Sequence, residues 1–158
     1  MNTSKFLNCL IVTAFIFLGP IRSVAQNCGP INTIQLKEML TQLGYTVKDL
    51  KSIKGKEKYE ASVKTPNFDV PIAFEISSST NFVWLTAFLG SAKEETSLTN
   101  NALLKQNAKI QPCQFYISES GKLMMGMAVE NRGLTNAILR RHIEKLANDV
   151  SGTASYWQ

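Results

Sequence analysis

The chain has 158 residues, a formal net charge of +5, 44% apolar residues and 18% charged residues. This composition excludes a disordered tail, and this length excludes a large multidomain enzyme. Subtracting a 25-residue leader leaves one domain of 133 residues. A domain of that size buries about two-thirds of its unfolded surface.

Residues 1–25 have the layout of a secretory signal peptide. Lys5 is the only early charge, residues 6–18 form a mainly apolar run, and a Gly-Pro pair follows that run at Pro20. A retained membrane anchor is the rival interpretation, but this run is well short of the roughly 20 residues that span a bilayer. No second apolar run of membrane length follows, so we expect no integral membrane span after cleavage.

Small side chains precede the expected cleavage site. Ser23 and Ala25 occupy the −3 and −1 positions that signal peptidase recognises, which makes Gln26 the new N-terminus. Because the leader carries Lys5 and Arg22 and no acid, its removal lowers the formal charge from +5 to +3. We therefore expect an exported protein, periplasmic or extracellular, with no nucleic-acid partner.

Cleavage also removes Cys9 and leaves two cysteines, Cys28 and Cys113. In an oxidising compartment, an even pair favours one disulfide. The two cysteines are 85 residues apart, and chain-entropy reasoning values a bridge across such a loop at about 4 kcal/mol. The alternative is that Cys113 is a small buried side chain and Cys28 a free terminal thiol.

Residues 32–43 are predicted to form an amphipathic helix. Asn32 and Gln35 have the spacing of a capping box, three leucines recur at helical spacing, and Gly44 is expected to end the helix. From there the hydrophobic period changes to that of a strand.

Alternating patterns cover residues 45–49, 59–64 and 70–77. Each pattern has one polar side, as in an antiparallel meander. Five lysines accompany the first two strands: Lys48, Lys51, Lys54, Lys56 and Lys58. No aromatic residue lies among them and Glu57 interrupts them, so we interpret them as a solvated hairpin edge guarded against strand addition.

Residues 82–89 are apolar on both faces of the predicted strand. One face packs on the core, and the other needs a cover within the chain or a partner. The aromatic residues Phe82, Trp84 and Phe88 are the candidate partner-binding residues, because exposed aromatic side chains often carry binding energy. A covering helix is the alternative.

Residues 97–108 are helical in character, and residues 113–117 and 123–129 read as a second hairpin. Thr135 caps a final helix whose apolar stripe extends to Val150. The order is thus helix, three or four strands, helix, two strands, helix. It predicts that residues 26–158 form a single α+β domain, an antiparallel sheet of about five to six strands with helices packed on one face.

The sequence carries no catalytic, cofactor or metal-binding signature. His142 is the only histidine and lies on or beside the apolar stripe of the last helix, where a core or boundary role fits it better. A Cys113–His142 dyad has no supporting motif, and one His with two distant Cys cannot close a metal site. Glu75 and Glu130 are interpreted as solvated strand residues rather than an acid pair. We expect no enzymatic activity, cofactor or metal.

Several segments match the pattern of a known family: Leu103-Leu104-Lys105-Gln106-Asn107-Ala108, Phe115-Tyr116-Ile117, Gly121-Lys122-Leu123, Gly133-Leu134-Thr135 and Leu139-Arg140-Arg141. With the order of elements and the terminal Tyr156-Trp157, they resemble the YbjN-like family, which shares the fold of class I type III secretion chaperones. The resemblance covers the chain from about Leu36 onward. It implies a compact, frequently dimeric domain that binds polypeptide or acts in regulation without catalysis.

The type III chaperones are cytoplasmic and typically acidic, whereas this chain has a predicted leader and a mature charge of +3. We therefore expect an envelope or secreted module that binds a protein or peptide partner, with a homodimer as one form. The alternatives are a small-ligand or lipid-binding envelope protein and, third, a cysteine-dependent enzyme.

Overall fold

The computed structural model of the chain describes residues 29–91 and 97–158, so the expected leader, its cleavage site and Cys28 lie outside the described residues. In chain order the elements are α1 (Thr33–Gln42), β1 (Lys48–Lys51), β2 (Lys58–Lys64), β3 (Asp69–Ile76), β4 (Phe82–Ser91), α2 (Ser97–Asn107), β5 (Gln114–Ile117), β6 (Lys122–Glu130), α3 (Asn136–Gly152) and the short 3₁₀ helix η1 (Ala154–Tyr156).

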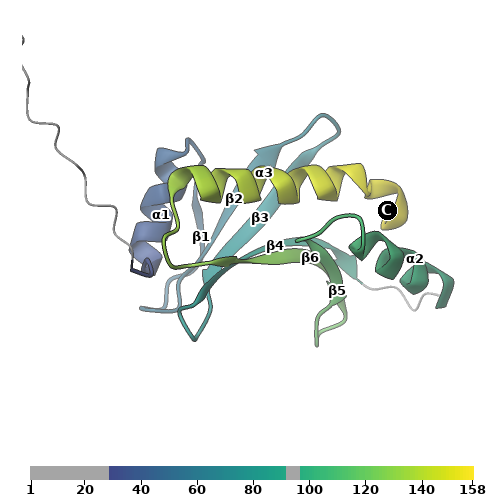
Figure 1. Ribbon diagram of the computed structural model, residues 1–158, viewed down its shortest axis with the longest axis horizontal. Coiled ribbons are helices and arrows are strands. Elements are labelled where there is room, and N and C mark those ends of the chain that lie inside the picture. The colour runs from purple at the N-terminus through teal and green to yellow at the C-terminus, as the bar shows by residue number, and fades with distance from the viewer. Residues whose placement is uncertain (1–28, 92–96) are drawn as a thin grey trace, which may run out of the picture.

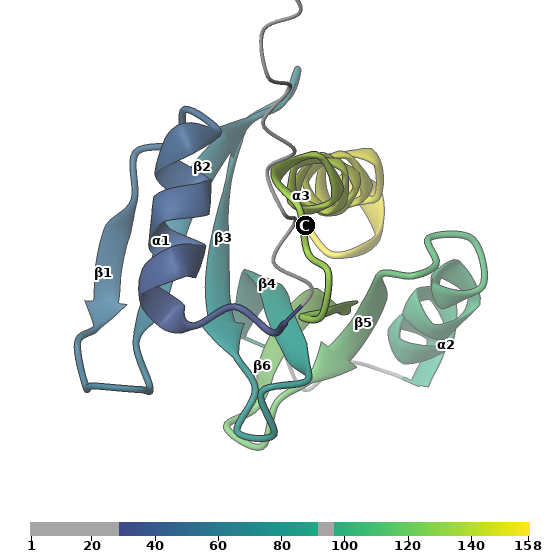
Figure 2. The ribbon, with the colours of Figure 1, turned by 60° about the vertical axis from the view of Figure 1, so that its left-hand side comes forward.

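The strands of this region form an antiparallel sheet in the order β1-β2-β3-β4-β6-β5. Helices α1 and α3 lie across one face of the sheet, and α2 lies beside β5 (Figures 1 and 2). The predicted α+β class, the element order and the two-layer arrangement are confirmed. No helix within the described residues is long and apolar enough to cross a membrane.

The first helix forms as the sequence predicts. The Asn32 side chain accepts a hydrogen bond from the Gln35 backbone N–H, and the Gln35 side chain accepts one from the Asn32 N–H, both at 2.9 Å. This capping box satisfies two N–H groups that the first helical turn leaves unpaired. Leu36 and Leu40 are fully buried, and Gly44, at φ 89°, supplies the left-handed conformation that follows the helix.

The first strand begins later than predicted, at Lys48 rather than at residue 45. Tyr45 and Val47 pack against the core, which accounts for their alternation in the sequence. Pairing with β2 starts only where Lys48 lies opposite Glu60. The alternating apolar residues therefore indicated which side chains pack on the core. A strand forms only where its backbone N–H and C=O groups also find a partner strand.

The last helix anchors the C-terminus of the chain. Thr135 caps α3 by accepting a hydrogen bond from the Ile138 N–H, and the predicted stripe buries Leu139, Ile143, Leu146 and Val150. The tail that follows also packs on the domain. The Trp157 ring meets the Phe68 ring edge to face, with centroids 6.0 Å apart, and its indole N–H donates to the Val150 carbonyl.

The core lies between this helix layer and the sheet. Phe74, Ile72 and Leu85 have no exposed surface. Met125 and Met127 are buried in the same cluster. Because alternate residues of a strand point to opposite faces, burial of these positions directs their neighbours away from the helices.

The lysine run lies on the hairpin at the β1 edge of the sheet, as predicted. Two of these lysines pair with carboxylates on the adjacent strand of the sheet. Lys48 Nζ lies 3.8 Å from Glu60 Oε1, and Lys58 Nζ lies 3.0 Å from Glu75 Oε2. The remaining lysines of the run are exposed, so the run is a charged edge strand and turn.

Candidate functional site

The face of the sheet that α1 and α3 leave uncovered is here named the open face (Figures 1 and 2). On β4, Val83, Leu85 and Ala87 are buried against the helices, so the residues between them point the other way. The open face of the middle strands and of β5 is made by Ala73, Glu75, Phe82, Trp84, Thr86, Phe88, Gln114, Tyr116, Met124, Gly126, Ala128 and Glu130.

The predicted partner-binding residues lie together on this face. Phe82 is 42% exposed, Phe88 is 54% exposed and Trp84 is half-buried. The segment that the sequence shows as apolar on both sides is therefore divided between core and surface. The covering helix, which was the alternative, is not found over these residues in the described part of the chain, because α1 and α3 pack on the opposite face.

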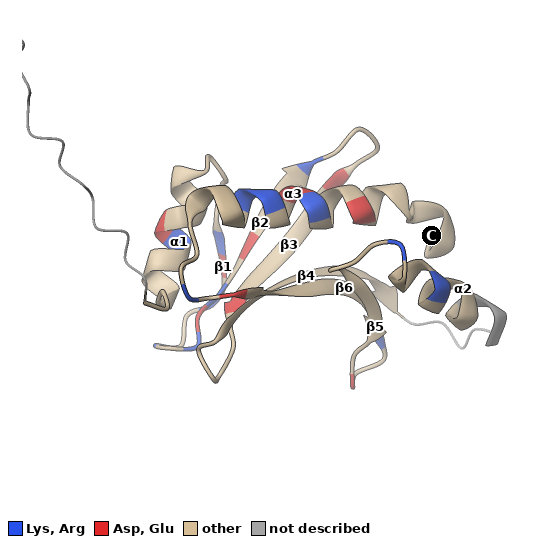
Figure 3. Cartoon of the chain, in the orientation of Figure 1, with Lys and Arg blue, Asp and Glu red and all other residues tan. Residues whose placement is uncertain are grey.

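The neighbouring strand extends the apolar surface. Trp84 lies opposite Ala128, and Phe88 lies opposite Met124 on β6. β4 carries no charged residue, whereas the strands on either side place Glu75 opposite Trp84 and Glu130 opposite Phe82. In Figure 3, charged segments also mark the helices and the β1–β2 side of the sheet. Lys122 Nζ lies 5.5 Å from the centre of the Phe88 ring, within the range of a cation–π contact.

A depression of about 430 Å³ opens on this face, lined by Glu75, Trp84, Thr86, Gln114 and Tyr116. We name it the Trp84–Tyr116 depression. A Cβ atom on Gly126 would lie 3.0 Å from the Leu85 carbonyl oxygen and 3.3 Å from the Tyr116 ring. The absence of a side chain at Gly126 therefore lets Tyr116 lie directly on β6.

Glu75 gives the Trp84–Tyr116 depression a negative character. It is the charged member of the lining, and its carboxylate pairs with Lys58 from β2. Burial raises the pKa of Tyr116 above its ordinary value, and the negative charge of Glu75 raises it further. The Tyr116 hydroxyl is thus protonated at neutral pH and keeps its donor capacity.

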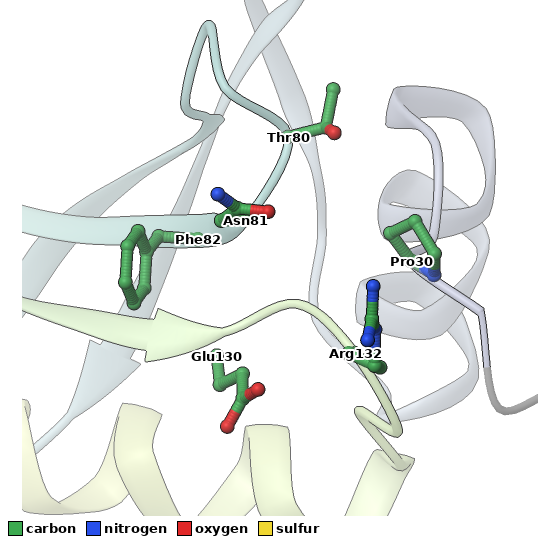
Figure 4. Close-up of a pocket in the computed structure, with 6 residues that line it drawn as sticks. All are labelled: Pro30, Thr80, Asn81, Phe82, Glu130 and Arg132. Atoms are coloured by element: carbon green, nitrogen blue, oxygen red, sulfur yellow. The ribbon is translucent and has the colours of Figure 1, made fainter.

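A second depression, of about 410 Å³, lies at one end of the open face and is lined by Pro30, Thr80, Asn81, Phe82, Glu130 and Arg132 (Figure 4). Asn131 organises its wall. The fully buried side chain of Asn131 donates to the Thr80 and Ile31 carbonyls and accepts from the Ile31 N–H. These bonds hold Thr80 at φ 58°, a conformation that non-glycine residues adopt rarely.

The edge of the sheet at β5 is closed by a side chain. Asn107, at the end of α2, accepts a hydrogen bond from the Phe115 N–H at 2.7 Å and donates one to the Phe115 carbonyl at 3.3 Å. The amide thereby satisfies the backbone groups of Phe115, which an added strand would otherwise use. At the opposite edge, the four residues of β1 are exposed and include two lysines, which disfavours strand addition there as well.

The Cys113 thiol is buried and its surroundings oppose reactivity. Burial and a hydrogen bond to the Asp149 carboxylate raise the pKa of Cys113 far above its ordinary value. Lys145 donates to Asp149 and to the Ile110 carbonyl beside it. A reactive cysteine needs a lowered pKa, so this environment is that of a structural thiol. Pairing with Cys28 stays a prediction, because Cys28 lies outside the described residues.

His142 is a half-buried residue of α3, in agreement with a boundary role. Burial lowers the pKa of His142, and the nearby Arg141 lowers it further. Glu75 and Glu130 share a face of the sheet but line different depressions. Within residues 29–91 and 97–158, no three His, Cys, Asp or Glu side chains gather closely enough to hold a metal ion.

Sequence reasoning missed two residues of the open face, Gln114 and Tyr116, and did not foresee the packing of Tyr116 on Gly126. The alternation of residues 113–117 does assign Gln114 and Tyr116 to the side opposite Phe115. That signal gives their side of the strand but not their neighbours, because the register β4-β6-β5 joins segments about 30 residues apart.

The comparisons with known proteins concern the fold. No family model and no curated protein sequence matches the chain. Among solved structures, the heterodimeric complex ExoU–SpcU from the type III secretion system of Pseudomonas aeruginosa is similar, in the chaperone SpcU, with a TM-score of 0.55 and 13% sequence identity. The match covers 77% of this chain and 96% of that one. The chain therefore has a secretion-chaperone-like fold.

Proposed function

We propose that this chain binds a polypeptide partner on the open face of its sheet, and that it does so without catalysing a reaction. The observation that carries the proposal is the row of aromatic residues Phe82, Trp84 and Phe88. They stand on an uncharged strand, and no helix of residues 29–91 and 97–158 lies over them. Aromatic side chains dominate the energetics of protein interfaces because they bury a large area at a small cost in side-chain entropy.

The two edges of the sheet favour docking on the face over strand addition. Strand addition needs free backbone groups along an edge strand. Asn107 occupies those of Phe115, and the other edge is charged. The open face offers side chains instead, so the partner binds through side-chain pockets and apolar contact.

The fold supports a protein partner. The similar solved structure is a complex of two different proteins, in which the chaperone-like chain is bound to ExoU. A shared fold does not by itself transfer a function, and the proposal therefore rests first on the open face. Membership of the YbjN-like family, to which the sequence resemblance points, is part of the same proposal.

We further propose that the protein acts outside the cytoplasm, after cleavage before Gln26. The layout of the first 25 residues supports this placement. The raised pKa of the buried Cys113 counts against this thiol as a catalytic nucleophile, which needs a lowered one.

The test compares two double variants that each remove exposed apolar side chains. Trp84→Ala with Phe88→Ala alters the open face. Ile34→Ala with Leu104→Ala alters two helical residues that are each 64% exposed and lie outside it. The tagged chain is isolated from its host, the bound polypeptide is identified by mass spectrometry, and its affinity for each purified variant is measured by calorimetry.

We expect the open-face variant to lose at least about tenfold in affinity, as hot-spot truncation does, while the helical variant retains the affinity of the unaltered chain. The helical variant should melt close to the unaltered protein, because Ile34 and Leu104 are exposed. The open-face variant should melt only a little lower, because Phe88 is exposed and Trp84 is half-buried. Equal affinities for the two variants would contradict the proposal, as would a collapse of the melting temperature that places Trp84 and Phe88 in the core.

A further inference from the structure

The Trp84–Tyr116 depression has the composition of a site for a cationic group. Trp84 and Tyr116 present aromatic rings, and Glu75 supplies a carboxylate. The other lining groups, the Thr86 hydroxyl and the Gln114 amide, can each accept a hydrogen bond. A carboxylate, aromatic rings and hydrogen-bond acceptors together favour a positively charged guest over an anion or a purely apolar one.

Gly126 shapes this depression. Because a Cβ at this position would lie 3.2 Å from Thr86 Cγ2 and 3.3 Å from Tyr116 Cε1, even alanine would crowd the floor. The missing side chain lets the Thr86 and Tyr116 side chains close over Gly126, so that both line the depression beside Trp84 and Glu75. The aromatic rings and the carboxylate therefore lie at the same place.

Glu75 already has a partner in Lys58, at 3.0 Å, but the pair leaves the carboxylate available. The two side chains are 33% and 44% exposed, and ion pairs exposed to this degree contribute little free energy. A carboxylate has about four lone-pair sites, so a second cation can share it. Lys58 is itself outside the lining of the depression.

Resting on the proposed function, we infer that the Trp84–Tyr116 depression receives an arginine side chain of the partner polypeptide. The guanidinium stacks on the Trp84 and Tyr116 rings and donates to the Glu75 carboxylate. Arginine fits better than lysine, because its planar group stacks on aromatic faces, binds a carboxylate through two hydrogen bonds and is less strongly hydrated than an ammonium. Flanking apolar side chains of the same segment reach Phe88 and Met124.

A small probe tests this site without knowledge of the partner. N-acetyl-arginine methylamide and the corresponding citrulline compound have nearly the same shape and differ in charge. Each is titrated into the full chain labelled with nitrogen-15, and the indole signal of Trp84 is followed. The indole of Trp157 is the internal control, because it donates to the Val150 carbonyl on the helix side of the molecule.

We expect the arginine compound to shift the Trp84 signal saturably and to bind about tenfold more tightly than citrulline. The Trp157 signal should not move. In Glu75→Gln the arginine compound should bind no better than citrulline. Glu60→Gln is the matched control, since Glu60 is also a strand carboxylate paired with a lysine but does not line the depression, and it should retain the preference.

Equal shifts by the two compounds, or an arginine preference that survives in Glu75→Gln, would overturn the inference. The experiments distinguish failure of the arginine site from failure of polypeptide binding on the open face. If Trp84→Ala with Phe88→Ala abolishes capture of the partner while arginine and citrulline bind alike, the open face binds a polypeptide of different chemistry. If arginine is preferred but no partner depends on the open face, the depression is a cation site alone.

Discussion

At Gly126, an added methyl group is expected to destabilise the fold. The added Cβ would lie 3.0 Å from the Leu85 carbonyl oxygen, a backbone atom that cannot rotate away. We expect Gly126→Ala to lower the free energy of unfolding by about 1–3 kcal/mol, as overpacking does, and to displace Tyr116 from β6. Urea denaturation and the Tyr116 NMR signals measure the two effects.

Gly152 provides the matched control for this substitution. It ends α3, and a Cβ there would meet no atom within 4 Å. Gly152→Ala should leave stability unchanged or raise it by up to about 1 kcal/mol, because alanine favours the helix. An equal loss of stability in both variants would show that β6 is not tightly packed at Gly126.

The division of β4 between core and surface predicts a difference between two phenylalanines. Phe88 is 54% exposed, whereas Phe74 on the adjacent strand has no exposed surface. Phe74→Ala should lower the free energy of unfolding by about 3–5 kcal/mol, and Phe88→Ala by less than about 1 kcal/mol. Denaturant titration of both variants checks this, and a comparable loss for Phe88→Ala would place it in a packed interface.

The environment of Cys113 predicts slow chemistry in the reduced protein. Burial raises the pKa of Cys113 in the fold, while the unfolded chain titrates near its ordinary value of 9.0. The unfolded state therefore loses its proton first, so this contribution to stability is complete below pH 9 and declines as the pH rises above 9. Cys113→Ala should reduce the loss of stability between pH 8 and pH 10.

Alkylation gives an independent measurement of the same thiol. At pH 8, iodoacetamide should modify Cys113 in the folded, reduced chain at least about a hundredfold more slowly than in urea, since only the thiolate of an accessible cysteine reacts. Rapid modification of the folded chain would contradict the burial of Cys113 beneath α3.

Among the elements, α2 and β5 illustrate how the fold protects an edge. Asn107→Ala removes both hydrogen bonds to the Phe115 backbone. We expect the free energy of unfolding to fall by about 1–2 kcal/mol and the exposed edge to promote self-association. Denaturation and sedimentation velocity measure these effects. Asn101→Ala, at an exposed position of the same helix, should change neither the stability nor the self-association. If Asn107→Ala also leaves both unchanged, Asn107 does not protect this edge.

The local signals in the sequence predicted the helices best. The capping box at Asn32 and the cap at Thr135 each depend on residues within one helical turn, so a linear pattern contains them. In contrast, β1 begins where Lys48 pairs with Glu60 of β2, and the sequence placed this start too near the N-terminus, at residue 45. Strand ends follow from pairing between distant segments, which periodicity does not contain.

At the scale of the whole molecule, the sequence predicted the class and the aromatic residues of the site but not the site itself. Phe82, Trp84 and Phe88 belong to one segment and share a face by alternation alone. Their meeting with Tyr116 and Gly126 requires the crossover that places β6 between β4 and β5. The Trp84–Tyr116 depression therefore depends on the order of the strands in the sheet, which the local sequence pattern does not contain.

Export is a property of the whole chain and has a direct measurement. Intact mass of the protein recovered from its host should correspond to a chain that begins at Gln26. A further loss of two hydrogens, reversed by a reducing agent, would identify the Cys28–Cys113 disulfide. A full-length mass that retains residues 1–25 would contradict the proposed location outside the cytoplasm.

The central claim is that the open face binds a polypeptide other than a second copy of this chain, and site-specific photo-cross-linking in the host tests it most directly. A benzophenone amino acid is placed at Phe88 on the open face and, as a control, at the exposed Glu144 of α3. We predict a discrete adduct with one other polypeptide from Phe88, absent in the presence of Tyr116→Ser with Trp84→Ser, and none from Glu144. Equal adducts from both positions, or adducts from Phe88 only with a second copy of this chain, would contradict it.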